Sequence, residues 1–128
     1  MGIPNFMGTF PKDRIPSPKR LPASFILNLD IMNQPGIHWV AVLMNRDNTV
    51  EYYDSLAEKP LSELYVWKKK ILYNNKPTQN IFAETCGHHA LYYLYLRSVV
   101  GFSQRDTLNR IYKCPNPDKY VKRFVDRF

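Results

Sequence analysis

Two neighbouring runs near the middle of the chain combine apolar, β-branched and aromatic residues in the pattern of β-strands. They span residues 37–45 and 49–56, and the polar residues 46–48 lie between them. Two such runs around a short polar turn indicate a β-hairpin. Antiparallel pairing brings the start of the first strand beside the end of the second. His38 and Asp54 are therefore expected at the same end of the hairpin.

Upstream of the hairpin, the pattern predicts one further strand and an irregular arm. Residues 23–31 are densely apolar and end in an alternation with polar neighbours, as in a strand. Residues 1–22 contain five prolines, which remove backbone donors and fix dihedral angles. We therefore expect an extended, Pro-rich arm without regular structure, anchored on the core by Phe6, Met7 and Phe10.

Downstream of the hairpin, apolar residues recur mostly at helical spacing. The first predicted helix covers residues 60–73 and is ended by Asn74 and Asn75, the second runs for about three turns from Thr85 and is closed by Gly101, and the third covers residues 104–112. A last helix begins at Pro117, and its expected buried stripe is Tyr120, Val121, Phe124, Val125 and Phe128. Thr85, Ser103 and Asn116 are the expected N-caps. The 128 residues fit a single domain, residues 1–128, with no room for a second.

The net charge of +7 is unevenly distributed along the chain. Eight of the 18 Lys and Arg residues, but three of the 11 Asp and Glu residues, lie within residues 97–128. This basic third would attract DNA or another acidic surface, or it would form the solvated faces of helices. Both interpretations stay open at this point.

Two further features of the sequence bear on the compartment. No stretch approaches the about 20 apolar residues that a membrane-spanning helix needs, and the amino terminus lacks the pattern of a signal peptide. The two cysteines, Cys86 and Cys114, are too few for a disulfide scaffold in a chain of this size. We expect an intracellular protein that is neither membrane-bound nor secreted.

Cys86 falls in the first turn of a predicted helix if Thr85 is the N-cap. Unpaired backbone N–H groups and the helix dipole stabilise negative charge there and lower the pKa of a thiol. A nearby imidazole would accept the thiol proton, and a carboxylate would orient the imidazole. His38 and Asp54 can be these two groups.

Two more residues would complete a nucleophilic site. The side-chain amide of Gln79 and the backbone N–H of Cys86 would stabilise an oxyanion, and Gly87 leaves room for a substrate backbone. Each of these residues could instead have a purely structural role. A lone cysteine is usually a core residue, a histidine in a strand is usually a hydrogen-bonded, half-buried side chain, and a glutamine in a loop usually faces water. The ordered set of His, Asp, Gln and Cys-Gly favours the nucleophilic site.

Cys86, His88 and His89 also raise the question of a metal site. Adjacent histidines on a helix point about 100° apart, and no spacing typical of zinc sites accompanies them. We therefore expect no metal here. His88 and His89 are expected to line the site or to contact a neighbouring strand, and Cys114 to be an incidental, partly buried thiol.

Four blocks of the sequence resemble those of the adenovirus-type cysteine proteases and their relatives that remove SUMO and similar modifiers. The His-Trp and acidic blocks lie in "HWVAVLMNRDNTVEYYDS" (residues 38–55), and they are followed by Gln79 and by "CG" at residues 86–87. The stretch "NFMGTFPKDRIP" (residues 5–16) is similar to the amino-terminal segment of the adenovirus branch. The seven-residue step from Gln79 to the cysteine also resembles that branch.

This resemblance implies an α+β fold with a papain-related active site in permuted chain order. The implied sheet is central and mainly antiparallel, packed by helices, with the nucleophile at a helix N-terminus. The implied site residues are His38 as general base, Asp54 as its orienting acid, Gln79 in the oxyanion hole, Cys86 as nucleophile, and Trp39 and Gly87 as substrate-binding residues beside a narrow groove.

The leading functional hypothesis from this resemblance is a thiol endopeptidase that matures capsid or core precursor proteins at glycine-containing sites. Its source would be a virus or a virus-like element, such as a Polinton-type transposon or a virophage. It would act as a monomer on polypeptides in the host nucleus, the cytoplasm or the virion, without a cofactor for the chemistry, and with DNA or a peptide as candidate activator. The alternatives are a deconjugase for a ubiquitin-like modifier and a catalytically inactive, basic DNA-binding module.

Overall fold

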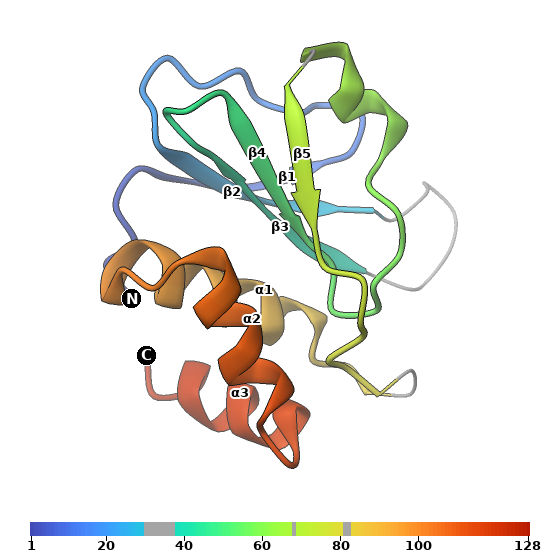
Figure 1. Cartoon of the computed structure of the whole chain (residues 1–128), viewed down its shortest axis with the longest axis vertical. Helices are drawn as coiled ribbons and strands as arrows, with labels where there is room; N and C mark the ends of the chain where they lie inside the picture. Colours follow the sequence, from blue (N-terminus) through green and yellow to red (C-terminus); the bar gives the residue numbers. More distant parts are fainter. Residues whose placement is uncertain (30–37, 68, 81–82) are drawn as a thin grey trace.

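One five-stranded sheet runs through the part of the chain that the structure describes, with its strands in the same order in space as in the sequence (Figure 1). This computed structural model describes residues 1–29, 38–67, 69–80 and 83–128. The strands are β1 (Phe6–Pro11), β2 (Ala23–Asn28), β3 (Trp39–Met44), β4 (Thr49–Tyr53) and β5 (Lys70–Tyr73).

The two inner strand pairs of the sheet are antiparallel and the two outer pairs are parallel. β3 lies between β2 and β4 and is antiparallel to both. β1 runs parallel to β2, and β5 runs parallel to β4. The predicted hairpin is confirmed as β3–β4, and Asn45 N–H donates to the Thr49 carbonyl to close its turn (2.9 Å). The expectation of a mainly antiparallel sheet is corrected to a mixed sheet.

Apolar side chains cover both faces of the sheet, so β2 is buried along nearly its whole length. The strand predicted over residues 23–31 is confirmed for β2, while residues 30–31 lie outside the described residues. A strand that is covered on both sides is continuously apolar rather than alternating. The helix-side cluster contains Ile26, Ala41, Leu43 and Tyr53 with Ala90, Tyr92, Tyr93, Leu94, Leu96, Ile111 and Val121; the other contains Phe25, Leu27, Val40, Val42, Met44, Val50, Tyr52 and Leu64.

The arm of residues 1–22 contains a strand that the proline content did not predict. β1 uses five of the six residues between Pro4 and Pro11 and ends at Pro11, whose missing N–H is tolerated at the end of an edge strand. Phe6 and Phe10 pack on the core as expected. Met7 points outward and is 36% exposed, so its predicted anchoring role is wrong.

The helix predicted over residues 60–73 is replaced by two shorter elements. A 3₁₀ helix spans Ser62–Trp67, and β5 follows as an edge strand. Leu64 is buried and Ile71 packs on the same apolar cluster. The apolar residues of this segment are spaced as in a single helix. Its carboxyl-terminal part nevertheless forms a strand, because its backbone hydrogen bonds are made with β4.

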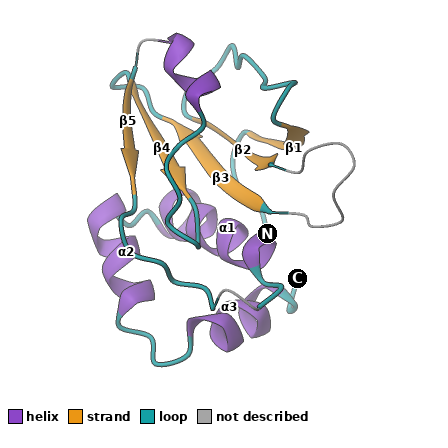
Figure 2. Ribbon diagram, turned by 90° about the vertical axis from the view of Figure 1, so that its right-hand side faces the viewer, coloured by secondary structure: helices purple, strands orange, loops and turns teal. Residues whose placement is uncertain are grey.

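The α-helices of the described residues lie together on one side of the sheet (Figures 1 and 2). They are α1 (Cys86–Tyr95), continued by a π-helical turn (Leu96–Val100), then α2 (Gln104–Tyr112) and α3 (Pro117–Val125). α1 packs against β3, and α3 packs against α1. Within the described ranges, no helix has the length and apolar character needed to cross a bilayer.

The predicted ends of these helices are confirmed at three places. Ser103 Oγ accepts a hydrogen bond from Asp106 N–H (3.1 Å), and Asn116 Oδ1 accepts one from Lys119 N–H (3.3 Å). Gly101 ends the helical run with a φ of +88°, a left-handed conformation that glycine adopts without strain. The local sequence therefore determines where α2 and α3 begin.

The predicted apolar stripe of α3 is confirmed only in part. Val121 is buried, and Phe124 and Val125 are half-buried against the helix-side cluster. Tyr120 and Phe128, which were expected on the same buried stripe, are exposed. α3 therefore contacts the rest of the protein along a narrower strip than its sequence suggests.

Candidate active site

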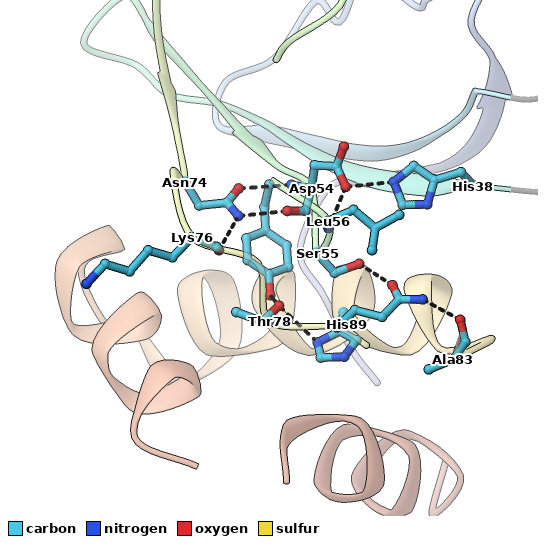
Figure 3. A network of polar contacts seen from close by, with 11 residues as sticks. His38, Asp54, Ser55, Leu56, Asn74, Lys76, Thr78, Ala83 and His89 are labelled. Atoms are coloured by element: carbon cyan, nitrogen blue, oxygen red, sulfur yellow. Dashed lines mark hydrogen bonds and ion pairs between the residues drawn. The ribbon is translucent and has the colours of Figure 1, made fainter. Parts of the chain in front are cut away.

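The ends of β3 and β4 bring His38 and Asp54 into contact. His38 directly precedes β3 and Asp54 directly follows β4, as the register of the hairpin predicts. His38 Nε2 lies 2.6 Å from Asp54 Oδ1 (Figure 3). The Asp54 side chain is almost fully buried, whereas 23% of the His38 side chain is exposed. The carboxylate is thus fixed inside the protein and the imidazole reaches the surface.

Asp54 is held from both its backbone and its side chain. The side-chain oxygen of Asn74 accepts from Asp54 N–H (3.0 Å), and the Asn74 amide donates to the Asp54 carbonyl (2.7 Å). Leu56 N–H donates to Asp54 Oδ1 (2.8 Å) (Figure 3). Asn74 is buried, although the sequence suggested only that it ends a helix. A buried asparagine after a strand has no spacing signal that would reveal this role.

Cys86 is the first residue of α1, and its side chain hydrogen-bonds with His38. Because His38 Nε2 is engaged with Asp54, the other ring nitrogen, Nδ1, is the one left for the sulfur. Backbone hydrogen bonds from Trp39 and Gly87 also stabilise the sulfur. The structure therefore brings together the carboxylate, the imidazole and the thiol that the sequence analysis singled out.

The protonation of this site favours charge on both the thiol and the imidazole. Burial lowers the pKa of His38, but hydrogen bonds with Asp54 and Cys86 and the attraction of their charges outweigh it and raise the pKa to about 9. Burial raises the pKa of Cys86, but the hydrogen bond with His38 and the backbone donors outweigh it and bring the pKa below that of an ordinary thiol. Both shifts favour a thiolate–imidazolium pair.

Gln79 lies in the segment between β5 and α1 and is oriented by Ser55. Ser55 Oγ donates to Gln79 Oε1 (2.5 Å), and the Ser55 carbonyl accepts from the backbone N–H groups of Thr78 (2.8 Å) and Gln79 (3.1 Å). Gln79 Nε2 donates one of its hydrogens to the Ala83 carbonyl (2.5 Å). Its second N–H is the one that could serve an oxyanion. Ser55, next to Asp54, is a supporting residue that the sequence analysis missed.

Thr85 occupies the N-cap position of α1 but does not cap the helix with its side chain. Its hydroxyl instead donates to Asp118 Oδ1 in α3 (2.7 Å). The predicted side-chain cap is therefore wrong. A cap needs the hydroxyl oxygen to accept from an N–H of the first turn, whereas the Thr85 hydroxyl is turned toward the Asp118 carboxylate and donates to it. The helix start that carries Cys86 is tied to α3 rather than closed on itself.

Trp39 and Gly87 are in direct contact. A Cβ atom added to Gly87 would lie 2.4 Å from Trp39 Cε3 and 2.8 Å from Cζ3. Glycine is thus required for the indole to pack beside the residue that follows Cys86. The Trp39 ring therefore lies in the space beside Gly87, and the expected role of Gly87 in binding a substrate backbone stays a prediction.

Gly87→Ala is expected to lower the free energy of unfolding by about 1–3 kcal/mol, because the indole of Trp39 must move to admit the methyl group. Urea unfolding of the wild type and the variant measures the loss. In a Trp39→Ala background the same change should cost much less, since the clash is gone. Equal costs in both backgrounds would contradict the contact.

His88 and His89 each pair with a carboxylate at or just after α3. His89 is fully buried and its Nε2 lies 2.8 Å from Asp118 Oδ1, while His88 Nε2 lies 3.1 Å from Asp126 Oδ1. The expectation that they line the site or contact a strand is corrected. Among the described residues, no group of His, Cys, Asp and Glu could hold a metal ion. Cys114 is partly buried, as expected.

Comparison with solved structures finds protease structures. The ASFV pS273R protease matches with a TM-score of 0.59 and 20% sequence identity, covering 80% of this chain and 40% of that protease. A Se-Met structure of the same protease matches with a TM-score of 0.47 and 21% sequence identity, covering 70% of this chain and 42% of that protease. The SUMO protease Ulp1, with its catalytic cysteine oxidized to a sulfonic acid, matches with a TM-score of 0.40 and 12% sequence identity, covering 77% of this chain and 52% of Ulp1.

The match to the ASFV pS273R protease shows that this chain shares its fold. The likeness to this type of protease, indicated by the sequence blocks, is therefore confirmed at the level of the fold. The chain spans less than half the length of the protease that it matches. No protein-family model matches the sequence, and no curated protein matches it either. The roles of the site residues and the permuted papain-like order stay predictions.

Proposed function

We propose that this protein is a thiol endopeptidase with Cys86 as nucleophile, His38 as general base and Asp54 as the residue that orients His38. One observation carries the proposal: the His38 ring hydrogen-bonds with the buried Asp54 carboxylate and with the Cys86 side chain. The shared fold with the ASFV pS273R protease supports the same reaction class. The residues present need no metal or cofactor for the chemistry.

The proposed reaction begins with the Cys86 thiolate and the His38 imidazolium. The thiolate attacks the carbonyl carbon of the scissile peptide bond, and the Cys86 N–H and Gln79 Nε2 stabilise the resulting oxyanion. His38 donates its proton to the leaving amine, which leaves a thioester on Cys86. His38 then takes a proton from water, the hydroxide attacks the thioester, and the acid product leaves as the Cys86 thiolate is released beside the His38 imidazolium.

The proposed substrates are precursor polypeptides of capsid or core proteins from a virus or a virus-like element. The adenovirus-type blocks of the sequence support this source. Cleavage at glycine-containing sites is supported by the Trp39 ring, which packs beside the residue that follows Cys86 and would crowd a substrate side chain. Peptides with glycine next to the scissile bond should be cleaved faster than alanine analogues, and equal rates would contradict this preference.

The reactivity of the Cys86 thiol tests the catalytic proposal. Cys86 is expected to react with iodoacetamide at pH 6–7, well below the pKa of about 8.5 of an ordinary thiol, because His38 holds its proton up to about pH 9. Mass spectrometry locates the modified cysteine, with Cys114 as the internal reference. His38→Ala should move the labelling of Cys86 to higher pH. Labelling of Cys86 that is no faster than that of Cys114 and ignores His38 would overturn the proposal.

The same preparation separates the other candidate functions. Rapid and selective release of ubiquitin-like modifiers from a panel of fusions would indicate a deconjugase instead. Peptide cleavage that is unchanged by added DNA at low salt would count against DNA as an activator. Salt-sensitive DNA binding together with an unreactive Cys86 would indicate an inactive binding module.

A further inference from the structure

A carboxylate of α3 lies at the centre of a hydrogen-bond cluster beneath the start of α1. Asp118 Oδ1 accepts from Thr85 Oγ1 (2.7 Å) and pairs with His89 Nε2 (2.8 Å), and Asp118 Oδ2 accepts from Asn80 N–H (3.0 Å). Thr85 and His89 belong to the beginning of α1, whereas Asn80 belongs to the segment before it. One side chain of α3 therefore holds two separate segments.

The hydrogen bonds of this cluster have a single consistent direction. Because a carboxylate only accepts, His89 must donate from Nε2, which leaves Nδ1 as an acceptor for Thr78 Oγ1 (3.4 Å). Thr78 in turn accepts from the hydroxyl of Tyr53 (2.5 Å). The pair with Asp118 raises the pKa of His89, but burial outweighs it and lowers the pKa below its usual value. A neutral His89 fits this direction of hydrogen bonding. The chain of donors runs from β4 to α3 and ends on Asp118.

Several members of this cluster are direct sequence neighbours of candidate active-site residues. Thr85 directly precedes Cys86, Asn80 directly follows Gln79, and Tyr53 directly precedes Asp54. A shift of Thr85 or Asn80 would therefore shift the nucleophile or the amide proposed for the oxyanion hole. Misplacement by about 1 Å can cost about 100-fold in rate.

We infer that Asp118 is a positioning residue of the candidate active site, which fixes the segments on either side of residues 81–84 so that Cys86 and Gln79 meet the substrate together. This inference rests on the proposed function. It gives α3, which contributes no residue to the chemistry, a defined part in assembling the site.

The chain itself provides a matched control for this inference. Asp126, also in contact with α1, lies 3.1 Å from His88 Nε2, but half of its side chain is exposed, and its other partner is Lys122. Asp118→Asn and Asp126→Asn therefore both remove one negative charge from a histidine–aspartate pair between α1 and α3. Only Asp118 is bonded to residues adjacent to Cys86 and Gln79.

Asp118→Asn is expected to lower kcat about 10-fold to 100-fold with little change in KM, and to slow iodoacetamide labelling of Cys86 at neutral pH. Asparagine turns an NH₂ group either toward Asn80 N–H or toward Thr85 and His89, which loosens Asn80 or Thr85. Loss of the negative charge alone would act in the opposite direction, because it would favour the thiolate. The direction of the change in labelling thus separates positioning from simple electrostatics.

Thr85→Val and Thr85→Ser extend the test to the other side of the contact. Valine keeps the shape of threonine but removes the hydroxyl, so it should reproduce the slow labelling, whereas serine keeps the donor and should restore it. Asp126→Asn should label like the wild type. Thermal unfolding of each variant shows whether the protein is folded at the assay temperature.

The outcomes are distinguishable. A reactive Cys86 in the wild type that is slowed by Asp118→Asn and Thr85→Val, but not by Asp126→Asn or Thr85→Ser, supports the inference. A reactive Cys86 that is unchanged in Asp118→Asn and Thr85→Val overturns the inference and leaves the proposed function standing. A wild-type Cys86 no more reactive than Cys114 overturns the proposed function, and the inference falls with it.

Discussion

Cys86→Ala is expected to abolish peptide cleavage, with kcat/KM reduced by about 10,000-fold or more. The reason is that the proposed mechanism passes through a thioester on this sulfur, and the imidazole of His38 then has no nucleophile to activate. The fold should survive, because the thiol is small and only partly buried. Cleavage of a peptide panel by wild type and variant, with thermal unfolding of both, measures the effect.

Cys114→Ala is the matched control for this experiment. Cys114 is also a free, partly buried thiol, but it follows α2 and has no part in the proposed site. Its removal should leave cleavage unchanged. Retained activity in Cys86→Ala, or activity that is lost with Cys114 instead, would refute the assignment of the nucleophile.

The largest expected loss of stability concerns a buried ion pair between β4 and the end of the α1 helical run. Arg97 donates to both oxygens of Glu51 (2.8 and 2.5 Å), and Tyr93 and Asn45 donate to the same carboxylate. The Glu51 side chain is 1% exposed and that of Arg97 is 18% exposed. Arg97 also donates to the Phe102 carbonyl (2.7 Å), so one side chain joins the sheet, the helix and the following loop.

Arg97→Met is expected to lower the free energy of unfolding by about 3–5 kcal/mol, because it leaves the Glu51 carboxylate buried without its cation. Urea unfolding at pH 7 measures the loss, and Arg105→Met, at an exposed position of α2, is the control. A loss below about 1 kcal/mol would show that water or other donors replace the guanidinium.

The pH dependence of this loss has a defined sign. Burial raises the pKa of Glu51, but the hydrogen bonds from Arg97, Tyr93 and Asn45 outweigh it and lower the pKa. The stabilisation is therefore present above the unfolded-state pKa of about 4.3 and is lost as the pH falls through the lower folded-state value. The difference between wild type and Arg97→Met should shrink on acidification.

The parts of the fold that the sequence predicted are those that depend on neighbouring residues. The hairpin follows from two apolar runs and a short turn, and its register alone places His38 beside Asp54. The caps Ser103 and Asn116 likewise need only residues three positions away. Local patterns were sufficient for these features because the stabilising contacts are themselves local.

β1 and β5 were missed because their partners are distant in the sequence. Each lies at an edge of the sheet and pairs in parallel with a strand that no short turn connects to it. The supporting residues of the candidate site were missed for a related reason. Asn74, Ser55 and Asp118 are polar residues of loops or helix starts, and only the tertiary structure shows that their partners are buried or adjacent to Cys86.

The hydrogen bond between Thr85 and Asp118 has a consequence for the time during protein synthesis at which the proposed activity can begin. Translation proceeds from the amino terminus, so His38, Asp54 and Cys86 leave the ribosome before Asp118 does. A nascent chain then holds the thiol and the imidazole but lacks the carboxylate that anchors the start of α1. The proposed protease activity of the chain is therefore expected to stay low until α3 has been made and has docked.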